Sequence, residues 1–217
     1  MTEMKTYIEH TNLKPDCTNP DVIKLCEEAI EHGFYGVCVS PYFVQLAKKT
    51  IKKSPVKIIT VVGFPLGYST VAAKVEETKK AIISGADEVD MVMNIAAFKS
   101  GDFATVLNDI QAVTTACHLQ NKIVKVIIET AYLNNEEIEK ACRLCMDCEV
   151  DFVKTSTGFA HAGATVEAVE LMRKTLPPKI KIKAAGGIRD AEFAEKLIQA
   201  GAARIGASAS VKIIGAE

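Results

Sequence analysis

Three stretches with one shared pattern decide the fold: KIVKVIIET at residues 122–130, DFVKTSTG at 151–158 and IKIKAAGG at 180–187. Each is a short apolar, β-branched run that carries a lysine and ends in small or polar residues. Such runs are typical of strands that are covered on both faces, as they are in parallel sheets. Their starts lie 29 residues apart, which is the length of one β-α unit.

Five further stretches of the same kind surround these three. They begin near Ile8 (IEHTNL), Tyr35 (YGVCVS), Lys57 (KIITVVGF), Glu88 (EVDMVMN) and Ala203 (ARIGAS). Together the stretches predict eight strands whose starts are 22 to 34 residues apart.

Amphipathic segments with helix caps separate most of the predicted strands. The first, residues 21–30, follows the capping residues Thr18 and Asn19 and stops at Gly33. The others are predicted at 71–84, 103–117, from 134 past 141, 165–173 and 190–199.

Strands that alternate with helices indicate βαβ units and a parallel sheet. Eight units predict closure into an α/β barrel of the (β/α)8 TIM type, formed by a single domain over residues 1–217. The alternative is an open doubly wound sheet, but no GxGxxG motif follows the first strand, and no Pro/Gly/Ser-rich linker marks a second domain.

Composition excludes several classes of protein. The 217 residues carry 26 Lys and Arg against 27 Asp and Glu, a net charge of −1, which argues against a nucleic-acid partner. No apolar run is long enough for a transmembrane helix, and residues 1–5 lack the apolar core of a signal peptide. The seven cysteines, an odd number, favour reduced thiols, so we expect a cytoplasmic protein without a membrane partner.

Charged residues inside the apolar strands are the unusual feature of this sequence. Asp90, Lys125, Lys154 and Lys183 lie on four consecutive strands, at positions whose side chains can all point into the barrel. The expected result is three ammonium groups around one carboxylate. A lysine beside a second cation in a desolvated site loses its proton more easily, and a neutral amine can attack a carbonyl to form a Schiff base. A nearby carboxylate can shuttle the protons, which is the chemistry of a metal-independent aldolase.

Glycines at the ends of the last three predicted strands indicate an anion site. Barrels often bind phosphate with backbone N–H groups of the loops after strands seven and eight. The candidate positions are Gly158, Gly186, Gly187, Gly206 and Ser208, with Arg189 as a further cation.

The same motifs resemble deoxyribose-phosphate aldolase, a class I aldolase family, over nearly the whole chain. The similar segments are VKTSTGF (153–159), IKAAGGIR (182–189), GADEVDMVMN (85–94), VKVIIET (124–130), IEHTNLKPDCT (8–18), VCVSP (37–41), VVGFPLG (61–67) and RIGAS (204–208). The resemblance implies a (β/α)8 lyase that reversibly cleaves 2-deoxy-D-ribose 5-phosphate to D-glyceraldehyde 3-phosphate and acetaldehyde, in deoxyribonucleotide catabolism.

The resemblance also assigns roles to single residues. Lys154 corresponds to the Schiff-base lysine, Lys183 to a second lysine that perturbs its pKa, and Asp90 to the proton-shuttling aspartate. Lys125 corresponds to the lysine that pairs with that aspartate, and Cys38 to a cysteine near the substrate. The supporting group also includes Thr155, directly after Lys154, and Glu9, where the family often has aspartate.

Two other functions would also use such a barrel: a phosphosugar isomerase, with Glu129 as its base, and a non-catalytic phosphosugar-binding protein. The isomerase would leave two interior lysines without a role, and the binding protein would not need a neutral Lys154, so the intact lysine motif counts against it. We therefore expect an aldolase that takes a phosphosugar and acetaldehyde, with no cofactor and no metal. The resemblance further implies a homo-oligomer, either a dimer or a tetramer.

Overall fold

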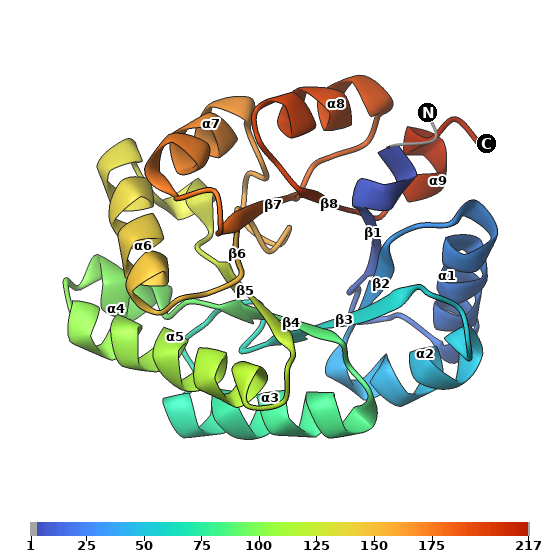
Figure 1. The fold of residues 1–217 in the computed structure, drawn as a ribbon, viewed down its shortest axis with the longest axis horizontal. Helices are drawn as coiled ribbons and strands as arrows, with labels where there is room; N and C mark the ends of the chain where they lie inside the picture. Colours follow the sequence, from blue (N-terminus) through green and yellow to red (C-terminus); the bar gives the residue numbers. More distant parts are fainter. Residues whose placement is uncertain (1–3, 217) are drawn as a thin grey trace.

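The structure is a computed structural model that describes residues 4–216. Over this range eight parallel strands pair in chain order, and the last strand pairs with the first to close a barrel (Figure 1). The strands are β1 Ile8–Asn12, β2 Gly36–Val39, β3 Lys57–Val62, β4 Glu88–Val92, β5 Ile123–Ile127, β6 Phe152–Lys154, β7 Lys181–Ala185 and β8 Arg204–Ala207. The TIM barrel predicted from the sequence is therefore confirmed, and the open sheet is excluded.

Helices surround the barrel on the outside (Figure 1). The α-helices are α1 Asn19–His32, α2 Val44–Ile51, α3 Val71–Ser84, α4 Ile95–Lys99, α5 Phe103–His118, α6 Asn135–Asp147, α7 Val166–Thr175, α8 Ala191–Gln199 and α9 Ser210–Ile213, and the short 3₁₀ helices are Met4–Tyr7, Pro41–Phe43 and Thr130–Tyr132. Within the described residues, none of the helices has the length and hydropathy needed to cross a bilayer.

Local sequence explains where the helices begin and end. At α1, the Thr18 side chain and Asp21 form a capping box, and Gly33 ends the helix in the left-handed region at φ 69°. Pro20 occupies the first turn, where its missing N–H costs nothing, so α1 starts two residues before the predicted position.

Alternation along the strands separates an outer core from the barrel interior. Outward residues such as Val89 and Met91 join the large apolar cluster between strands and helices. Inward residues Cys38, Ile59 and Val61 form a small separate cluster inside the barrel. The remaining interior space holds charged side chains that the strand register brings together.

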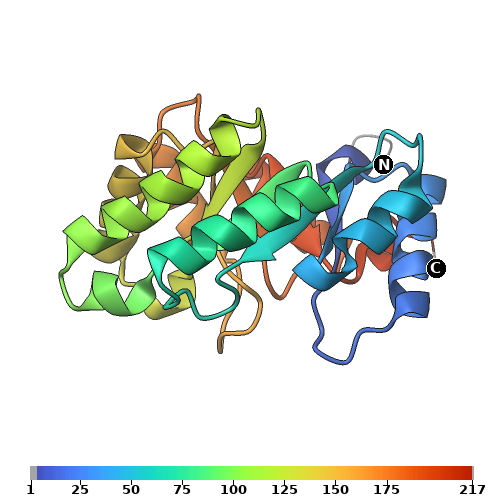
Figure 2. The ribbon, with the colours of Figure 1, turned by 90° about the horizontal axis from the view of Figure 1, so that it is seen from below.

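The carboxyl ends of all eight strands meet at one end of the barrel, because the strands are parallel. The loops that follow β1 and β6 project toward this same side (Figure 2). In barrels of this kind, the loops at this end form the functional site.

Candidate active site

The interior lysines converge on one carboxylate. Strand register sets Asp90 beside Lys125, and Lys154 beside Lys183. Oδ2 of Asp90 accepts hydrogen bonds from Nζ of Lys154 at 2.9 Å and from Nζ of Lys183 at 2.6 Å. Oδ1 accepts from Nζ of Lys125 at 2.9 Å. The structure therefore brings together the four side chains that strand parity predicted.

Glu9 supplies a second carboxylate to the same cluster. Its side chain is fully buried, one oxygen accepts from Nζ of Lys183, and the other lies 3.4 Å from Nζ of Lys125. Glu88 adds a third carboxylate, 2.5 Å from Nζ of Lys125. The expectation of three ammonium groups around a single carboxylate is therefore wrong: three lysines face three carboxylates.

These neighbours shift the pKa values of the two lysines on β6 and β7 in opposite directions. Burial lowers the pKa of Lys154, Asp90 opposes the shift, and the charge of Lys183 lowers it further, so the net direction is down. Burial also acts on Lys183, but Asp90 and Glu9 outweigh it and raise the pKa of this lysine. Lys154 is thus the amine that more readily becomes neutral, and a neutral amine is a nucleophile.

Asp90 remains ionised between the lysines. Burial alone would raise its pKa, but the charges of Lys125, Lys154 and Lys183 lower it well below the ordinary range. The pKa of Lys125 is raised well above its usual value, since three carboxylates outweigh its burial. The site therefore contains a fixed anion flanked by two firmly protonated amines and one labile amine.

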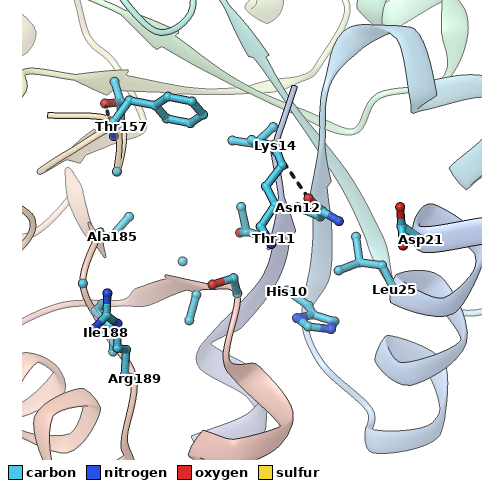
Figure 3. A pocket seen from close by; sticks show the side chains of 18 of the residues that line it. His10, Thr11, Asn12, Lys14, Asp21, Leu25, Thr157, Ala185, Ile188 and Arg189 are labelled. Atoms are coloured by element: carbon cyan, nitrogen blue, oxygen red, sulfur yellow. Dashed lines mark hydrogen bonds between the residues drawn. The ribbon is translucent and has the colours of Figure 1, made fainter. Parts of the chain in front are cut away.

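A pocket of about 500 Å³ opens over this cluster at the carboxyl ends of the strands. Among the three interior lysines of the described chain, only Lys154 lines it. Figure 3 shows the pocket between Arg189 and Ile188 on one side and His10 and Asn12 on the other. Of the three, Lys154 is therefore the amine that a molecule in this pocket meets directly.

The predicted anion positions all line this pocket. They are Gly158, Gly186, Gly187, Gly206 and Ser208. Gly158, Gly186 and Gly187 have φ values of 88°, 88° and 76°, a region that favours glycine and lets backbone N–H groups approach an anion. Arg189 also lines the pocket and is exposed.

Thr155 and Cys38 lie beside the cluster rather than in the pocket lining. Oγ1 of Thr155 donates to the Ala185 carbonyl at 3.2 Å and accepts from the Ala185 N–H at 3.1 Å, which fixes β6 against β7. Cys38 is fully buried, and burial raises the pKa of its thiol to about 11, so it remains protonated at neutral pH.

Glu129, the base that an isomerase would need, is engaged elsewhere. Its carboxylate accepts from the N–H of Thr157 at 3.2 Å and from the Thr157 hydroxyl. It lines a separate cavity of about 260 Å³ beside Tyr132 and Phe159, not the pocket that holds Lys154.

The structure adds two features that sequence reasoning did not assign. Gly163 packs directly on Gly186, because a Cβ at position 163 would lie 2.2 Å from the Gly186 carbonyl oxygen. His10 lines the pocket and contacts Ser210 at 2.9 Å and Glu28 at 2.8 Å. No local sequence signal predicts the first, since Gly163 and Gly186 are 23 residues apart, and the partners of His10 are also distant in the chain.

Comparisons with known proteins agree with this geometry. The model of the family described as DeoC/LacD family aldolase matches residues 4–216. A deoxyribose-phosphate aldolase from Thermococcus gammatolerans is 54% identical over 214 residues, which cover 98% of this chain and 95% of that protein.

Solved structures show the same similarity. QR15, an aldolase, is 41% identical with a TM-score of 0.94, and the match covers 99% of this chain and 96% of QR15. The deoxyribose phosphate aldolase of Aeropyrum pernix, described as having a unique tetrameric structure, is 28% identical with a TM-score of 0.92. The match covers 99% of this chain and 90% of the Aeropyrum pernix chain.

Proposed function

The chain belongs to the DeoC/LacD family of aldolases, and from this membership we propose that it cleaves 2-deoxy-D-ribose 5-phosphate reversibly to D-glyceraldehyde 3-phosphate and acetaldehyde through a Schiff base on Lys154. The observation that carries the proposal is that Lys154 alone of the interior lysines in residues 4–216 lines the pocket, and its pKa is the one lowered among them. Deoxyribose-phosphate aldolases of about this length are more than half identical to the chain.

The reaction begins at the aldehyde carbon of the open-chain sugar. The neutral Nζ of Lys154 attacks C1, and loss of water from the carbinolamine gives a protonated imine. The imine draws electrons as the bond between C2 and C3 breaks, while the C3 hydroxyl gives up its proton. Glyceraldehyde 3-phosphate leaves with the phosphate, and an enamine remains on Lys154.

The second half of the reaction returns the enzyme to its starting state. A proton adds to C2 of the enamine, and water hydrolyses the resulting imine to release acetaldehyde. We assign the proton transfers to Asp90 and Lys183, because Oδ2 of Asp90 bonds both Nζ atoms at 2.9 and 2.6 Å. Nζ of Lys125 donates to the other oxygen of Asp90, Oδ1, at 2.9 Å and so holds this carboxylate in place.

The phosphate of the substrate fits the glycine-lined end of the pocket. The loops after β6, β7 and β8 supply Gly158, Gly186, Gly187, Gly206 and Ser208 there, and Arg189 lies at the same end. Backbone N–H groups and one hydroxyl bind the anion without a metal, and the imine itself is the electron sink.

Borohydride reduction with acetaldehyde, followed by peptide mass spectrometry, tests the proposal. We expect an ethyl group on the peptide that contains Lys154, and loss of both the adduct and the turnover of deoxyribose 5-phosphate in Lys154→Met. Ethylation of Lys183 alone, or no adduct in an enzyme that turns over, would overturn the assignment.

Two controls accompany this experiment. Lys181→Met removes an exposed lysine at the opposite end of the barrel and should leave both adduct and turnover unchanged. Treatment with EDTA should also leave turnover unchanged, whereas a loss that zinc restores would indicate a metal-dependent mechanism.

We further propose that residues 1–217 act as one domain and that the protein is a cytoplasmic homo-oligomer. The continuous apolar cluster that surrounds the barrel supports a single domain, and the free cysteines suit a reducing compartment. The tetrameric relative from Aeropyrum pernix supports an oligomer. Light scattering during size-exclusion chromatography would separate a dimer or tetramer from a monomer.

A further inference from the structure

A second group of interacting side chains, polar and aromatic, lies at the end of the barrel opposite the pocket. It consists of Tyr35, Glu88, Phe152 and Arg204, and we call it the floor cluster. Tyr35 directly precedes β2, and the other three are the first residues of β4, β6 and β8. None of the four lines the pocket that holds Lys154.

Glu88 connects the floor cluster to the active site. Its side chain is 2% exposed, the hydroxyl of Tyr35 donates to Oε1, and Oε2 lies 2.5 Å from Nζ of Lys125. The same ammonium lies 2.9 Å from Oδ1 of Asp90 and 3.4 Å from Glu9. Glu88 is therefore the nearest of the three anions around Lys125.

Two aromatic rings and the Arg204 cation support Glu88 at this end of the barrel. The guanidinium of Arg204 stacks 3.6 Å above the centre of the Tyr35 ring. The ring of Phe152, which is buried, lies 5.7 Å from Nζ of Lys125 and 5.7 Å from the Arg204 guanidinium. These contacts fix the Tyr35 hydroxyl, and this hydroxyl fixes the Glu88 carboxylate.

The arrangement divides the Asp90 carboxylate into two halves. Oδ1 faces Lys125 and the floor cluster, and Oδ2 faces Lys154 and Lys183. If Glu88 did not hold Lys125, this ammonium would be free to move onto Asp90 and Glu9, where it would compete with the other lysines for the same oxygens.

We propose that Glu88, oriented by Tyr35, is a positioning residue that holds Lys125 on one oxygen of Asp90 and so keeps the other oxygen for the reacting lysine. The inference rests on the aldolase function proposed above. Glu88 touches no substrate atom in this view, and its effect reaches Lys154 only through Lys125, Asp90 and the charge that it contributes.

The charge of Glu88 should be visible in the pH dependence of activity. Three ionisable groups act on Lys154: Asp90 of β4, Lys183 of β7 and Cys38 of β2. The groups around Lys125 are Glu88 and Asp90 of β4, Glu9 of β1 and, more weakly, Cys117 of α5. Glu88 itself interacts with Lys125, Tyr35 and Asp90.

Removal of the Glu88 charge from this buried set makes protonation of Lys154 less favourable, because fewer negative charges then stabilise the ammonium.

Glu88→Gln is the direct test, since it keeps the shape of the side chain and removes its charge. We expect the acid limb of kcat/KM for deoxyribose 5-phosphate to move to lower pH by roughly half to one unit. We also expect kcat to fall about tenfold while KM changes less than about twofold, as for a residue remote from the bound substrate. Glu88→Asp retains the charge and should return the acid limb to its wild-type position.

Asp109→Asn is the matched control. Asp109 forms another buried ion pair, with Lys74 at 2.5 Å, but on the helices outside the barrel. This variant should lower the unfolding temperature without moving the acid limb. A general loss of stability is thereby separated from an effect on Lys154.

The outcomes distinguish this inference from the proposed function. If the wild-type enzyme neither turns over nor forms the Lys154 adduct, the proposed function fails. If it does both, but Glu88→Gln has a wild-type acid limb, the positioning role is refuted. If Glu88→Gln does not fold, Tyr35→Phe decides: kcat reduced about threefold at unchanged KM supports the role, and unchanged kcat refutes it.

Discussion

At the scale of the residue, two lysines of the same type differ because their neighbours differ. Lys154 has Asp90 and the pocket beside it, whereas Lys183 has both Asp90 and Glu9. The second carboxylate is enough to raise the pKa of Lys183 while the pKa of Lys154 falls. The division of work between nucleophile and proton carrier thus follows from the position of Glu9.

Lys183→Leu tests this division. We expect turnover of deoxyribose 5-phosphate to fall by about 10²- to 10⁴-fold, because a proton carrier and the cation beside Lys154 are both lost. Circular dichroism should show an unchanged fold, although Glu9 and Asp90 lose a partner. Lys181→Leu, two residues earlier and exposed, is the control, and wild-type turnover in Lys183→Leu would contradict the assigned role.

Most of the proposed site residues could be predicted because parity along a strand fixes which side chains share a face. Asp90 and three lysines follow from this rule alone. Glu88 shares the parity of Asp90, but parity alone does not predict its role. Its hydrogen-bond partner Tyr35 is 53 residues away, and a charged residue that opens a strand usually reaches solvent. Pairing between distant strand ends depends on barrel closure, which a local pattern does not contain.

At the scale of the element, the loop between β6 and α7 supports the predicted phosphate loop. The N–H of Ala164 donates to the carbonyls of Ala185 and Gly186, each at 3.1 Å. Gly163 leaves no room for a side chain against Gly186. The backbone after β7 is therefore held in place by a neighbouring loop as well as by its own turn.

Gly163→Ala should displace this backbone. We expect KM for deoxyribose 5-phosphate to rise about tenfold, because the added methyl would overlap the Gly186 carbonyl oxygen, only 2.2 Å away, and force the backbone to shift. Ethylation of Lys154 by acetaldehyde and borohydride should be unaffected, since acetaldehyde has no phosphate. Ala162→Ser, an exposed change in the same loop, is the control, and an unchanged KM in Gly163→Ala would refute the supporting role.

The predicted elements agree with the structure wherever the pattern is long. Every strand starts within one residue of its predicted position, and the helix at 71–84 has the predicted bounds. The eight-residue helix α2 was not among the predicted helices, and neither were the short helices α4 and α9, of five and four residues. Helices of this length present no periodic apolar face, and tertiary contacts rather than sequence pattern determine whether they form.

At the scale of the whole molecule, the near-zero net charge is repeated inside the barrel. The chain carries 26 basic and 27 acidic residues. In the interior Lys125, Lys154 and Lys183 face the carboxylates of Glu9, Glu88 and Asp90. Buried ions are costly unless paired, and this balance allows a barrel with a charged interior to fold.

The buried carboxylates make stability dependent on acid. The pKa values of Asp90 and Glu88 are lowered in the folded state, so their stabilisation is present above the unfolded value and is lost as pH falls through the folded one. Asp109, whose pKa burial raises, acts in the opposite direction.

We therefore expect the unfolding temperature to be nearly constant from about pH 7 to 5 and to fall below about pH 4. Differential scanning calorimetry across this range is the measurement. In Glu88→Gln the fall should be shallower, because one of the groups that binds a proton on unfolding is gone. An unfolding temperature that rises on acidification would contradict this account.

The seam between β1 and β8 also bears on how the protein is made. Glu9 pairs with Gly206 across this seam, and its carboxylate bonds Lys183, 174 residues further along the chain. On the ribosome, the first strand emerges early but finds its neighbour only after the last strand has been synthesised. Until then the barrel has two open edges and Lys183 lacks one of its anions. The nascent chain should therefore acquire activity abruptly, once β8 pairs with β1, rather than strand by strand.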